Sequence, residues 1–466
     1  MGRSASLNLD SILNLIMTKI LVAGASGFIG HELIDAFLCN PEIEIIALSR
    51  REQVSKHPRV EWRKCDLFSL KDLQEVMTGV NQAYYLVHSM LPSAALSQGS
   101  FYDFDLLMAD NFTRAAKKAS VSHIVYLGGM IPETGELSWH LRSRLEVEET
   151  LRSSGIPVTT LRAGLIIGPH GSSFTILQKL VERLPLMVCP PWTKTLSQPV
   201  ALRDIIRVLI KAFEDPEVQG RIYDIGGQEI LNYQDLILKT AKLAGKNRPL
   251  LSFPFIPLRL SGLWVSFITG APRNLVFPLV LSLKHQMLVS PKRLWPFPSD
   301  LETSLETSLR AALDAPSVPR SANKAPIQHD VRSIQRMHLP ANKTAEWVYL
   351  QFFKWIPTAF PIGIRVKVFG NFCEFYLFFP KFKLLILEKS EERSTSDRQL
   401  LYIRGGYLAR KTIRGRLEFR EVLHQKFVMA AIHDYIPALP WFIYRFTQAK
   451  AHLWTMRAFG RFLVGN

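Results

Sequence analysis

Cysteine is scarce in this chain of 466 residues, and the spacing of the four cysteines excludes two kinds of stabilised fold. Cys39, Cys65, Cys189 and Cys373 lie far apart and form no C-x-x-C pair. Zinc frameworks and disulfide-rich secreted domains both need closely spaced cysteines. We therefore expect no metal site and no disulfide framework, and a reducing, cytoplasmic compartment fits this composition best.

Long apolar runs are missing as well. No window reaches the roughly 18 uncharged apolar residues that a membrane-spanning helix needs, and the nearest candidate, 262–283, is interrupted by Pro272, Arg273 and Pro278. The first sixteen residues lack the apolar core and cleavage site of a secretion signal. Translation begins at Met1 or at Met17, which directly precedes a strand-like run. Integral membrane topology is not expected, and peripheral contact with the inner membrane face stays open.

Acidic residues are few in the last third of the chain. Residues 331–466 contain 22 Lys or Arg against 9 Asp or Glu, whereas residues 1–330 contain 35 against 31. The net charge of the whole chain, +17, therefore comes mainly from its C-terminal part. Such a local surplus predicts an anionic partner or surface for that part alone.

The first 250 residues alternate apolar runs typical of strands with segments typical of helices. The expected strands are 20–23, 43–48, 60–64, 83–87, 123–127 and 158–161. Short connections between such elements produce a right-handed, doubly wound parallel sheet. We predict an α/β domain of the Rossmann type over residues 17–300, with helix-rich cap elements over about 172–300.

The chain changes character beyond residue 300. Residues 301–330 contain the near-repeat 301–309 and segments rich in serine and proline, a composition typical of a linker. Residues 331–466 form a second predicted domain of α+β class, with 25 Phe, Trp or Tyr among the last 121 residues. A terminal helix is predicted at about 441–463.

Three glycines follow the first predicted strand in the segment Gly24-Ala25-Ser26-Gly27-Phe28-Ile29-Gly30. A nucleotide pyrophosphate must approach the backbone without an intervening Cβ, and it binds free N–H groups at a helix N-terminus. A tight turn also uses glycine, but this placement between a strand and a helix is typical of dinucleotide binding. The segment therefore predicts a pyrophosphate site.

The end of the second predicted strand indicates the cofactor. An acidic residue there would bind the ribose hydroxyls of NAD, but this chain has Ser49-Arg50-Arg51. Two guanidinium groups can pair with the additional phosphate of NADP, although arginines also commonly decorate surface turns. We predict NADP, with NAD as the alternative.

Several segments resemble the atypical and extended branch of the short-chain dehydrogenase/reductase superfamily, close to the epimerase-like and NmrA-like NAD(P)-binding proteins. They are GASGFIG at 24–30, CDL at 65–67, YYLVHSM at 84–90, VYLGGM at 125–130, LRAGLIIGP at 161–169 and PVALRDI at 199–205. More narrowly, HLRSRLEVE at 140–148 and AIHDYIPALPWFIY at 431–444 resemble a bacterial group in which a START or polyketide-cyclase-like domain follows the reductase-like domain.

The resemblance implies which residues surround a bound nicotinamide dinucleotide. Besides the glycine segment and the two arginines, they follow the third and fourth predicted strands: Asp66, Leu67, Val87, His88 and Ser89. Asp66 would lie beside the adenine, and His88 near the nicotinamide ribose. A histidine at such a place is more often a packing or hydrogen-bonding residue, so His88 is a secondary catalytic candidate.

Active members of the superfamily use a Ser, a Tyr and a Lys, with the Tyr and Lys spaced Y-x-x-x-K. This chain has Gly128 and Gly129 where Ser is expected, and His140 and Arg144 where Tyr and Lys are expected. Arg144 cannot exchange protons, and its charge favours a neutral His140, which is a poor acid. Either His140 is a substituted acid or base one turn from Arg144, or the site binds nucleotide without catalysis. The joint replacement of all three roles favours the second interpretation.

The basic, aromatic C-terminal part is open to several interpretations. A START-like domain would enclose a lipid, quinone or polyketide-like ligand, and basic side chains around it could meet an anionic membrane surface. Nucleic-acid binding also uses interleaved basic and aromatic residues. The aromatic residues lie in apolar strands, however, which disfavours nucleic acid and makes an aromatic core with a solvated basic face the simplest interpretation.

Three functions follow from these observations. The leading hypothesis is an atypical NAD(P)-dependent oxidoreductase or epimerase-like enzyme that acts on an apolar carbonyl-bearing ligand. The alternative is a non-catalytic protein that senses NADP(H) or carries a lipid or quinone. The third is an assembly factor at the membrane surface, anchored by its C-terminal domain.

Overall fold

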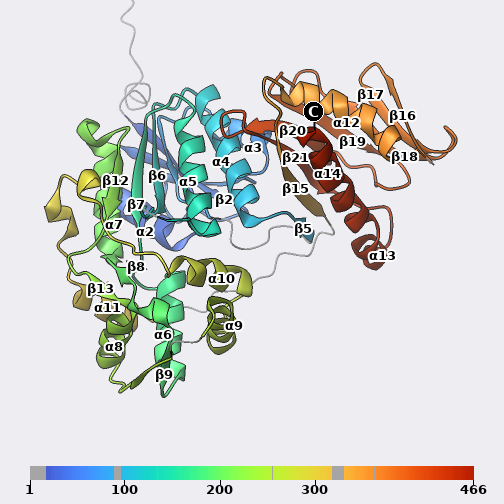
Figure 1. The fold of residues 1–466 in the computed structure, drawn as a ribbon. Helices are drawn as coiled ribbons and strands as arrows, with labels where there is room; N and C mark the ends of the chain where they lie inside the picture. The colour runs from blue at the N-terminus through green and yellow to red at the C-terminus, as the bar shows by residue number, and fades with distance from the viewer. Residues whose placement is uncertain are drawn as a thin grey trace, which may run out of the picture. The chain divides into compact units, whose positions relative to one another are not determined.

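A computed structural model describes residues 17–88, 96–133, 135–253, 256–316, 330–361 and 363–465 (Figure 1). The chain forms two compact units. Unit 1 holds the described residues up to 88 and those from 108 to 316, and unit 2 holds residues 96–107 and those from 330 onward.

Seven parallel strands form the sheet of unit 1, in the order β12-β7-β6-β4-β1-β2-β3. Their bounds are β1 (Thr18–Ala23), β2 (Ile43–Ser49), β3 (Val60–Lys64), β4 (Gln82–Tyr85), β6 (His123–Gly129), β7 (Val158–Ala163) and β12 (Ile222–Ile225). Most of these strands are nearly continuous apolar runs because helices cover both faces of the sheet. The predicted doubly wound parallel sheet is confirmed.

Helices flank both faces of this sheet (Figure 1). Helices α2 (Phe28–Phe37) and α7 (Leu202–Glu214) pack together on one face and form the main core with the strands. On the other face lie α3 (Leu70–Val76), α4 (Phe101–Lys118) and α5 (Trp139–Arg152). Helix α4 begins within unit 2 and continues into unit 1.

The remaining elements of unit 1 form a helical cap with its own apolar core. Its helices are α6 (Ser172–Arg183), α8 (Tyr233–Leu243), α9 (Leu258–Thr269), α10 (Arg273–Ser282) and α11 (Leu305–Asp314), with short 3-10 turns at 191–194, 216–218, 291–293 and 298–301. Its short strands are β8 (Ile166–Ile167), β9 (Met187–Cys189), β10 (Leu196–Ser197), β11 (Val200–Ala201), β13 (Leu231–Asn232) and β14 (Leu250–Ser252). They pair as β10 with β13, β11 with β8, and β14 with β9.

Helix α11 lies within the stretch that the sequence indicated as a linker. Ser304 caps the helix by accepting a hydrogen bond from the backbone N–H of Thr307 at 3.1 Å. Leu305 and Leu309 are buried one helical turn apart, so the near-repeat follows the helical period and packs in the cap. The first part of the expected linker is therefore a helix that packs in the cap. Residues 317–329 lie outside the described residues.

Unit 2 contains an eight-stranded sheet in the order β16-β17-β18-β19-β20-β21-β15-β5. Its strands are β5 (Leu96–Gln98), β15 (Val331–His338), β16 (Ile364–Phe369), β17 (Phe372–Leu377), β18 (Lys383–Lys389), β19 (Arg398–Gly405), β20 (Arg416–Val422) and β21 (Phe427–Tyr435). All neighbours are antiparallel except β15 and β5. Strand β5 comes from a region that the sequence analysis placed in the first domain.

Helices α12 (Ala345–Ala359) and α14 (Gln448–Val464) pack on one face of this sheet. The ring of Phe352 in α12 lies 5.3 Å from that of Phe419 in β20 and 5.1 Å from that of Phe459 in α14. The predicted terminal helix is two helices, because the backbone turns at Thr447 between α13 (Trp441–Phe446) and α14. In the part of the chain described, no helix has the length and apolar character needed to cross a bilayer.

Candidate functional site

The glycine segment forms a tight connection between β1 and α2. Gly24 has φ 94°, and a Cβ there would lie 2.9 Å from the carbonyl oxygen of Leu86. A Cβ on Gly30 would lie 2.7 Å from the Cα of Ala25. These two positions therefore need glycine because the loop packs closely against the chain after β4 and against the first turn of α2.

The N-terminus of α2 is open to an anion. Gly27 is its N-cap residue, so no side chain accepts a hydrogen bond from the first-turn N–H groups, and this turn contains no acidic residue. Ser26 and Gly27 are exposed, whereas Ala25 is buried. Exposed N–H groups at the positive end of a helix favour a negatively charged ligand.

Arg50 and Arg51 directly follow β2, the strand beside β1 in the sheet. Both side chains are exposed, and in the described residues no carboxylate forms an ion pair with either. The hydroxyl of Ser49 accepts a hydrogen bond from the backbone N–H of Arg51 at 3.1 Å, which shapes the turn. Two guanidinium groups are thus available to an anionic ligand at the same edge of the sheet as the glycine segment.

The residues predicted after β3 and β4 lie at that edge too. The backbone of Leu86 donates to Ala23 at 2.9 Å, so the chain leaving β4 runs beside the glycine segment toward Val87 and His88. Asp66 accepts a hydrogen bond from the backbone N–H of Phe68 at 3.1 Å. Leu67 is buried, and its carbonyl accepts from the side chain of Asn111 at 2.9 Å. Ser89, the last residue predicted for this site, lies outside the described residues.

Two predicted catalytic residues are brought together. His140 is half-buried in the first turn of α5, and its ring centroid lies 5.0 Å from that of the exposed His88, with 36° between the ring planes. An imidazole at this place can donate or accept a proton beside the predicted nicotinamide position. Arg144, one turn further along α5, is buried with 5 % of its surface exposed.

The space expected for a catalytic serine is filled by other side chains. A Cβ on Gly128 would lie 2.8 Å from the ring of Tyr126, and a Cβ on Gly129 would lie 3.2 Å from the Cγ of Arg144. The hydroxyl of Tyr126 donates to the backbone carbonyl of Arg144 at 3.2 Å. Tyr126 and Arg144 thus pack against the two glycines and against each other. The sequence motifs did not indicate these contacts.

The sequence left open whether Arg162 forms a structural salt bridge or contacts a substrate, and it did not indicate the partner that the structure shows. Arg162 at the end of β7 donates two hydrogen bonds of 2.8 Å to the carboxylate of Glu148 in α5, and both side chains are buried. This bidentate pair joins the helix that carries His140 to the sheet. Such a pair could be predicted only if β7 and α5 were already known to be neighbours.

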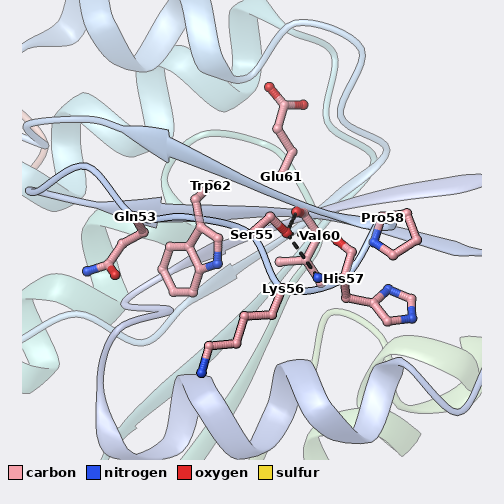
Figure 2. A pocket seen from close by; sticks show the side chains of 8 residues that line it. All are labelled: Gln53, Ser55, Lys56, His57, Pro58, Val60, Glu61 and Trp62. Atoms are coloured by element: carbon pink, nitrogen blue, oxygen red, sulfur yellow. Dashed lines mark hydrogen bonds between the residues drawn. The ribbon is translucent and has the colours of Figure 1, made fainter.

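A hollow of about 460 Å³ lies beside the loop between β2 and β3 (Figure 2). Its lining consists of Gln53, Ser55, Lys56, His57, Pro58, Val60, Glu61 and Trp62. Figure 2 shows the side chains of Lys56 and Trp62 directed toward α2. The hollow includes neither the glycine segment nor the two arginines, and among the described residues no cluster of three His, Cys, Asp or Glu side chains could hold a metal ion.

Comparison with known proteins identifies a family for unit 1. A family model described as the NmrA-like family matches residues 17–259. The auxiliary protein GraX of Staphylococcus aureus is 31% identical over 144 residues, which is 30% of this chain. The match covers 43% of the length of GraX.

Two solved structures illustrate the likeness in fold. The NADPH-dependent quinone oxidoreductase of Escherichia coli, complexed with NADPH, has a TM-score of 0.50 at 18% identity, covering 64% of this chain and 100% of that chain. The UDP-glucuronic acid 4-epimerase of Bacillus cereus, in complex with UDP-glucuronic acid and NAD, has a TM-score of 0.48 at 19% identity, covering 64% and 98%.

Proposed function

Because this chain belongs to the NmrA-like family, we propose that unit 1 binds a nicotinamide dinucleotide at the segment Gly24–Gly30. The observation that carries this proposal is the uncapped N-terminus of α2 directly after a loop in which Gly24 and Gly30 admit no Cβ. A pyrophosphate there would accept hydrogen bonds from first-turn N–H groups. Asp66 and Leu67, after β3, would border the adenine, and Val87 and His88, after β4, the nicotinamide ribose.

We infer that NADP is the preferred dinucleotide. Arg50 and Arg51 are exposed at the end of β2, and in the described part of the chain no carboxylate forms an ion pair with either. The last residue of the strand is Ser49 and not an acidic residue, and the next carboxylate along the chain, that of Glu52, pairs with Lys64. Guanidinium groups pair well with a phosphate on the ribose. The preference rests on these two side chains, since the similar solved structures share only the fold with this chain.

The chemistry that we propose is a reductase or epimerase-like reaction on an apolar, carbonyl-bearing ligand. The bound dinucleotide would supply or accept the hydride. His140 would exchange a proton with the substrate oxygen, since it is the half-buried imidazole at the position of the usual tyrosine. Arg144 and Glu148 would position α5 through the carbonyl contact with Tyr126 and the ion pair with Arg162.

A second function has its own support. The ring of Tyr126 occupies the space that a serine side chain at position 128 would need, so one member of the usual catalytic set has no room. This favours a protein that binds NADP(H) without turnover. The two functions share the cofactor site and differ only in whether a proton and a hydride move there.

Binding is tested by titrating the full chain with NADPH and NADH in a calorimeter. Gly27→Asp places a carboxylate at the proposed phosphate position; its φ of −84° allows a side chain, and its Cβ would lie 3.0 Å from the carbonyl oxygen of Gly24, so thermal unfolding verifies the fold of the variant. We expect at least about a tenfold loss of affinity, or 1.4 kcal/mol. Lys117→Gln changes the net charge equally at the opposite edge of the sheet and should bind normally. Absence of heat with either nucleotide in the parent chain would contradict the proposal.

Turnover is tested by isotope exchange at the nicotinamide C4 with a panel of apolar carbonyl compounds. If His140 moves the proton, His140→Ala should lower kcat about 100-fold or more and leave the affinity for NADPH unchanged. His424→Ala, in an exposed turn of unit 2, is the control. Full activity of His140→Ala would show that the assignment is wrong, and NADPH binding without any exchange would support the second function.

For unit 2 we propose a START-like domain. The support is its architecture, an antiparallel sheet with a long C-terminal helix, α14, packed on one face. The ring of Phe352 contacts those of Phe353 and Phe459 between helices and sheet, so an apolar ligand would have to displace or line these aromatic side chains. Native mass spectrometry of the purified chain would reveal a retained lipid or quinone.

A further inference from the structure

Three segments of unit 2 meet at one end of its sheet. They are 377–383 between β17 and β18, 406–415 between β19 and β20, and 435–446 after β21; together we call them the loop end. The backbone of Tyr407 donates to Lys383 at 2.9 Å, and the ring centroids of Phe382 and Tyr407 lie 6.3 Å apart. The backbone of Ala438 donates to Leu408 at 3.1 Å. The three segments therefore form one continuous surface.

Large apolar side chains are exposed across this surface. The exposed fractions are 66% for Phe379, 60% for Tyr407, 90% for Ile413, 69% for Phe442 and 63% for Phe446. Phe378, also exposed, has φ 57°, a conformation that bulky residues rarely adopt. Single exposed apolar residues are ordinary, but aromatic side chains gathered from three segments indicate a binding surface.

The charge of the loop end has one sign. The loop end contains six Lys or Arg and no Asp or Glu, and residues 447–466, which follow it, add three Lys or Arg and again no Asp or Glu. Lys383 pairs with Glu374, and Arg414 lies near Asp434. Within the described chain, no carboxylate forms an ion pair with the remaining cations: Lys381, Arg410, Lys411, Arg445, Lys450, Arg457 and Arg461.

Aromatic and basic groups alternate at close range. Where α13 is followed by α14, the guanidinium carbon of Arg445 lies 5.8 Å and the ammonium nitrogen of Lys450 lies 5.5 Å from the ring centroid of exposed Phe446. Phe442 and Phe446 are four residues apart, so they share one side of the helix. An exposed ring between two unpaired cations matches a boundary that is apolar on one side and anionic on the other.

We propose that the loop end docks unit 2 on an anionic lipid bilayer. The exposed rings would enter the boundary between headgroups and acyl chains, and the cations would contact lipid phosphates and carboxylates. A nucleic acid would match the charge but would leave side chains such as Ile413 and Phe379, at loop tips, without an apolar partner. This inference goes beyond the proposed function and does not depend on dinucleotide binding.

The test is flotation of the full chain with vesicles of phosphatidylcholine alone and with about one-third phosphatidylserine. We expect binding only to the anionic vesicles, decreasing as salt is raised. Arg445→Glu with Lys450→Glu should lower the partition coefficient by at least about 25-fold, which is about fivefold for each cation removed. Phe379→Ser with Phe442→Ser should lower it at constant charge.

A matched control is available at the other end of the same sheet. Lys343 and Lys426 lie near the turn between β20 and β21, where Leu339 donates to Lys426 at 3.2 Å. Lys343→Glu with Lys426→Glu changes the net charge as much as the first pair does and should float normally. Thermal unfolding of every variant verifies the fold.

Three outcomes would overturn the proposal. The first is no flotation of the parent chain with anionic vesicles. The second is equal loss in the control pair, which would make the effect one of net charge. The third is unchanged flotation of the variant Phe379→Ser with Phe442→Ser, which would assign the loop end to a polyanion. Flotation that depends on a dimer detected by sedimentation would also overturn the proposal, because the loop end would then bind a second copy of the chain.

Discussion

At the scale of single residues, the proposed preference for NADP rests on Arg50 and Arg51. Their guanidinium groups would each contribute charge-assisted hydrogen bonds to the phosphate of NADP and none to NADH. We therefore expect Arg50→Ala with Arg51→Ala to raise the Kd for NADPH by about 10- to 100-fold and to leave the Kd for NADH within about twofold. Calorimetric titration with both nucleotides measures this difference.

The control for this experiment removes two cations elsewhere. Lys117 and Lys118 are exposed at the end of α4, on the opposite edge of the sheet. Lys117→Ala with Lys118→Ala should bind both nucleotides as the parent chain does. A parent chain that prefers NADH, or arginine variants that lose both nucleotides equally, would contradict the role given to Arg50 and Arg51.

The sequence predicted those residues of the candidate site whose type is required by the local backbone geometry. Gly24, Gly27 and Gly30 stand between a strand and a helix, and this context together with their spacing indicated a loop without room for side chains, as Gly24 and Gly30 show. The contact of Tyr126 with Gly128 was not predictable in the same way, although both lie on β6. Which side chain fills a neighbour's space depends on packing between α5 and the sheet, and one sequence does not show that packing.

At the scale of elements, the side chain of His123 links three neighbouring parallel strands, β4, β6 and β7, at their N-terminal ends. Its side chain is buried at the start of β6 and lies 2.9 Å from the Gln82 oxygen of β4 and 2.8 Å from the Thr159 hydroxyl of β7. Burial lowers the pKa of His123 from 6.5 to about 4, because the protonated ring loses hydration. The unfolded chain therefore binds a proton more readily than the folded chain between these two pH values.

The stabilisation from neutral His123 is complete above about pH 6.5 and is lost as the pH falls toward 4. We expect the free energy of unfolding of unit 1 to fall by roughly 2–3 kcal/mol between pH 7 and 4.5 through this residue. In His123→Gln, the free energy of unfolding should fall by that amount less over the same pH range. Urea unfolding at both pH values, followed by hydrogen exchange in β6 and β7, measures it.

His424→Gln is the control for the pH experiment, because His424 lies in an exposed turn of unit 2. Its pH dependence should equal that of the parent chain. If His123→Gln and the parent chain lose stability in parallel between pH 7 and 4.5, the burial of a neutral His123 does not set the acid sensitivity of unit 1.

Strong periodicity made most elements of unit 1 predictable, and weak or ambiguous periodicity explains where prediction failed. The six expected strands all appear, because parallel strands are nearly continuous apolar runs. The segment 305–314 was taken for part of a linker because it overlaps the near-repeat 301–309 and precedes segments rich in serine and proline, yet its buried leucines follow the helical period. Strand β5 has only three residues, too few to show an alternation.

At the scale of the whole molecule, the order of the sequence does not match the division into units. Residues 96–107 come early in the chain but belong to unit 2, where β5 extends the sheet beside β15. The side chain of Gln98 donates to the carbonyl of Ala449 in α14 at 2.9 Å. A division into residues 17–300 and 331–466 would therefore remove one strand from the second sheet, and sequence alone does not show such a non-contiguous partner.

Asp103 tests whether this early segment supports unit 2. Its carboxylate lies 2.7 Å from the Nε of Arg336 in β15, and both side chains are largely buried. Removing one partner of a buried pair costs about 3–5 kcal/mol, so Asp103→Asn should speed amide hydrogen exchange in β15 of the full chain by about 100-fold or more. Asp110→Asn, which removes a pair with Arg114 within α4, should leave β15 protected. Equal protection of β15 in the parent chain and in Asp103→Asn would show that the pair between Asp103 and Arg336 does not stabilise this edge of unit 2.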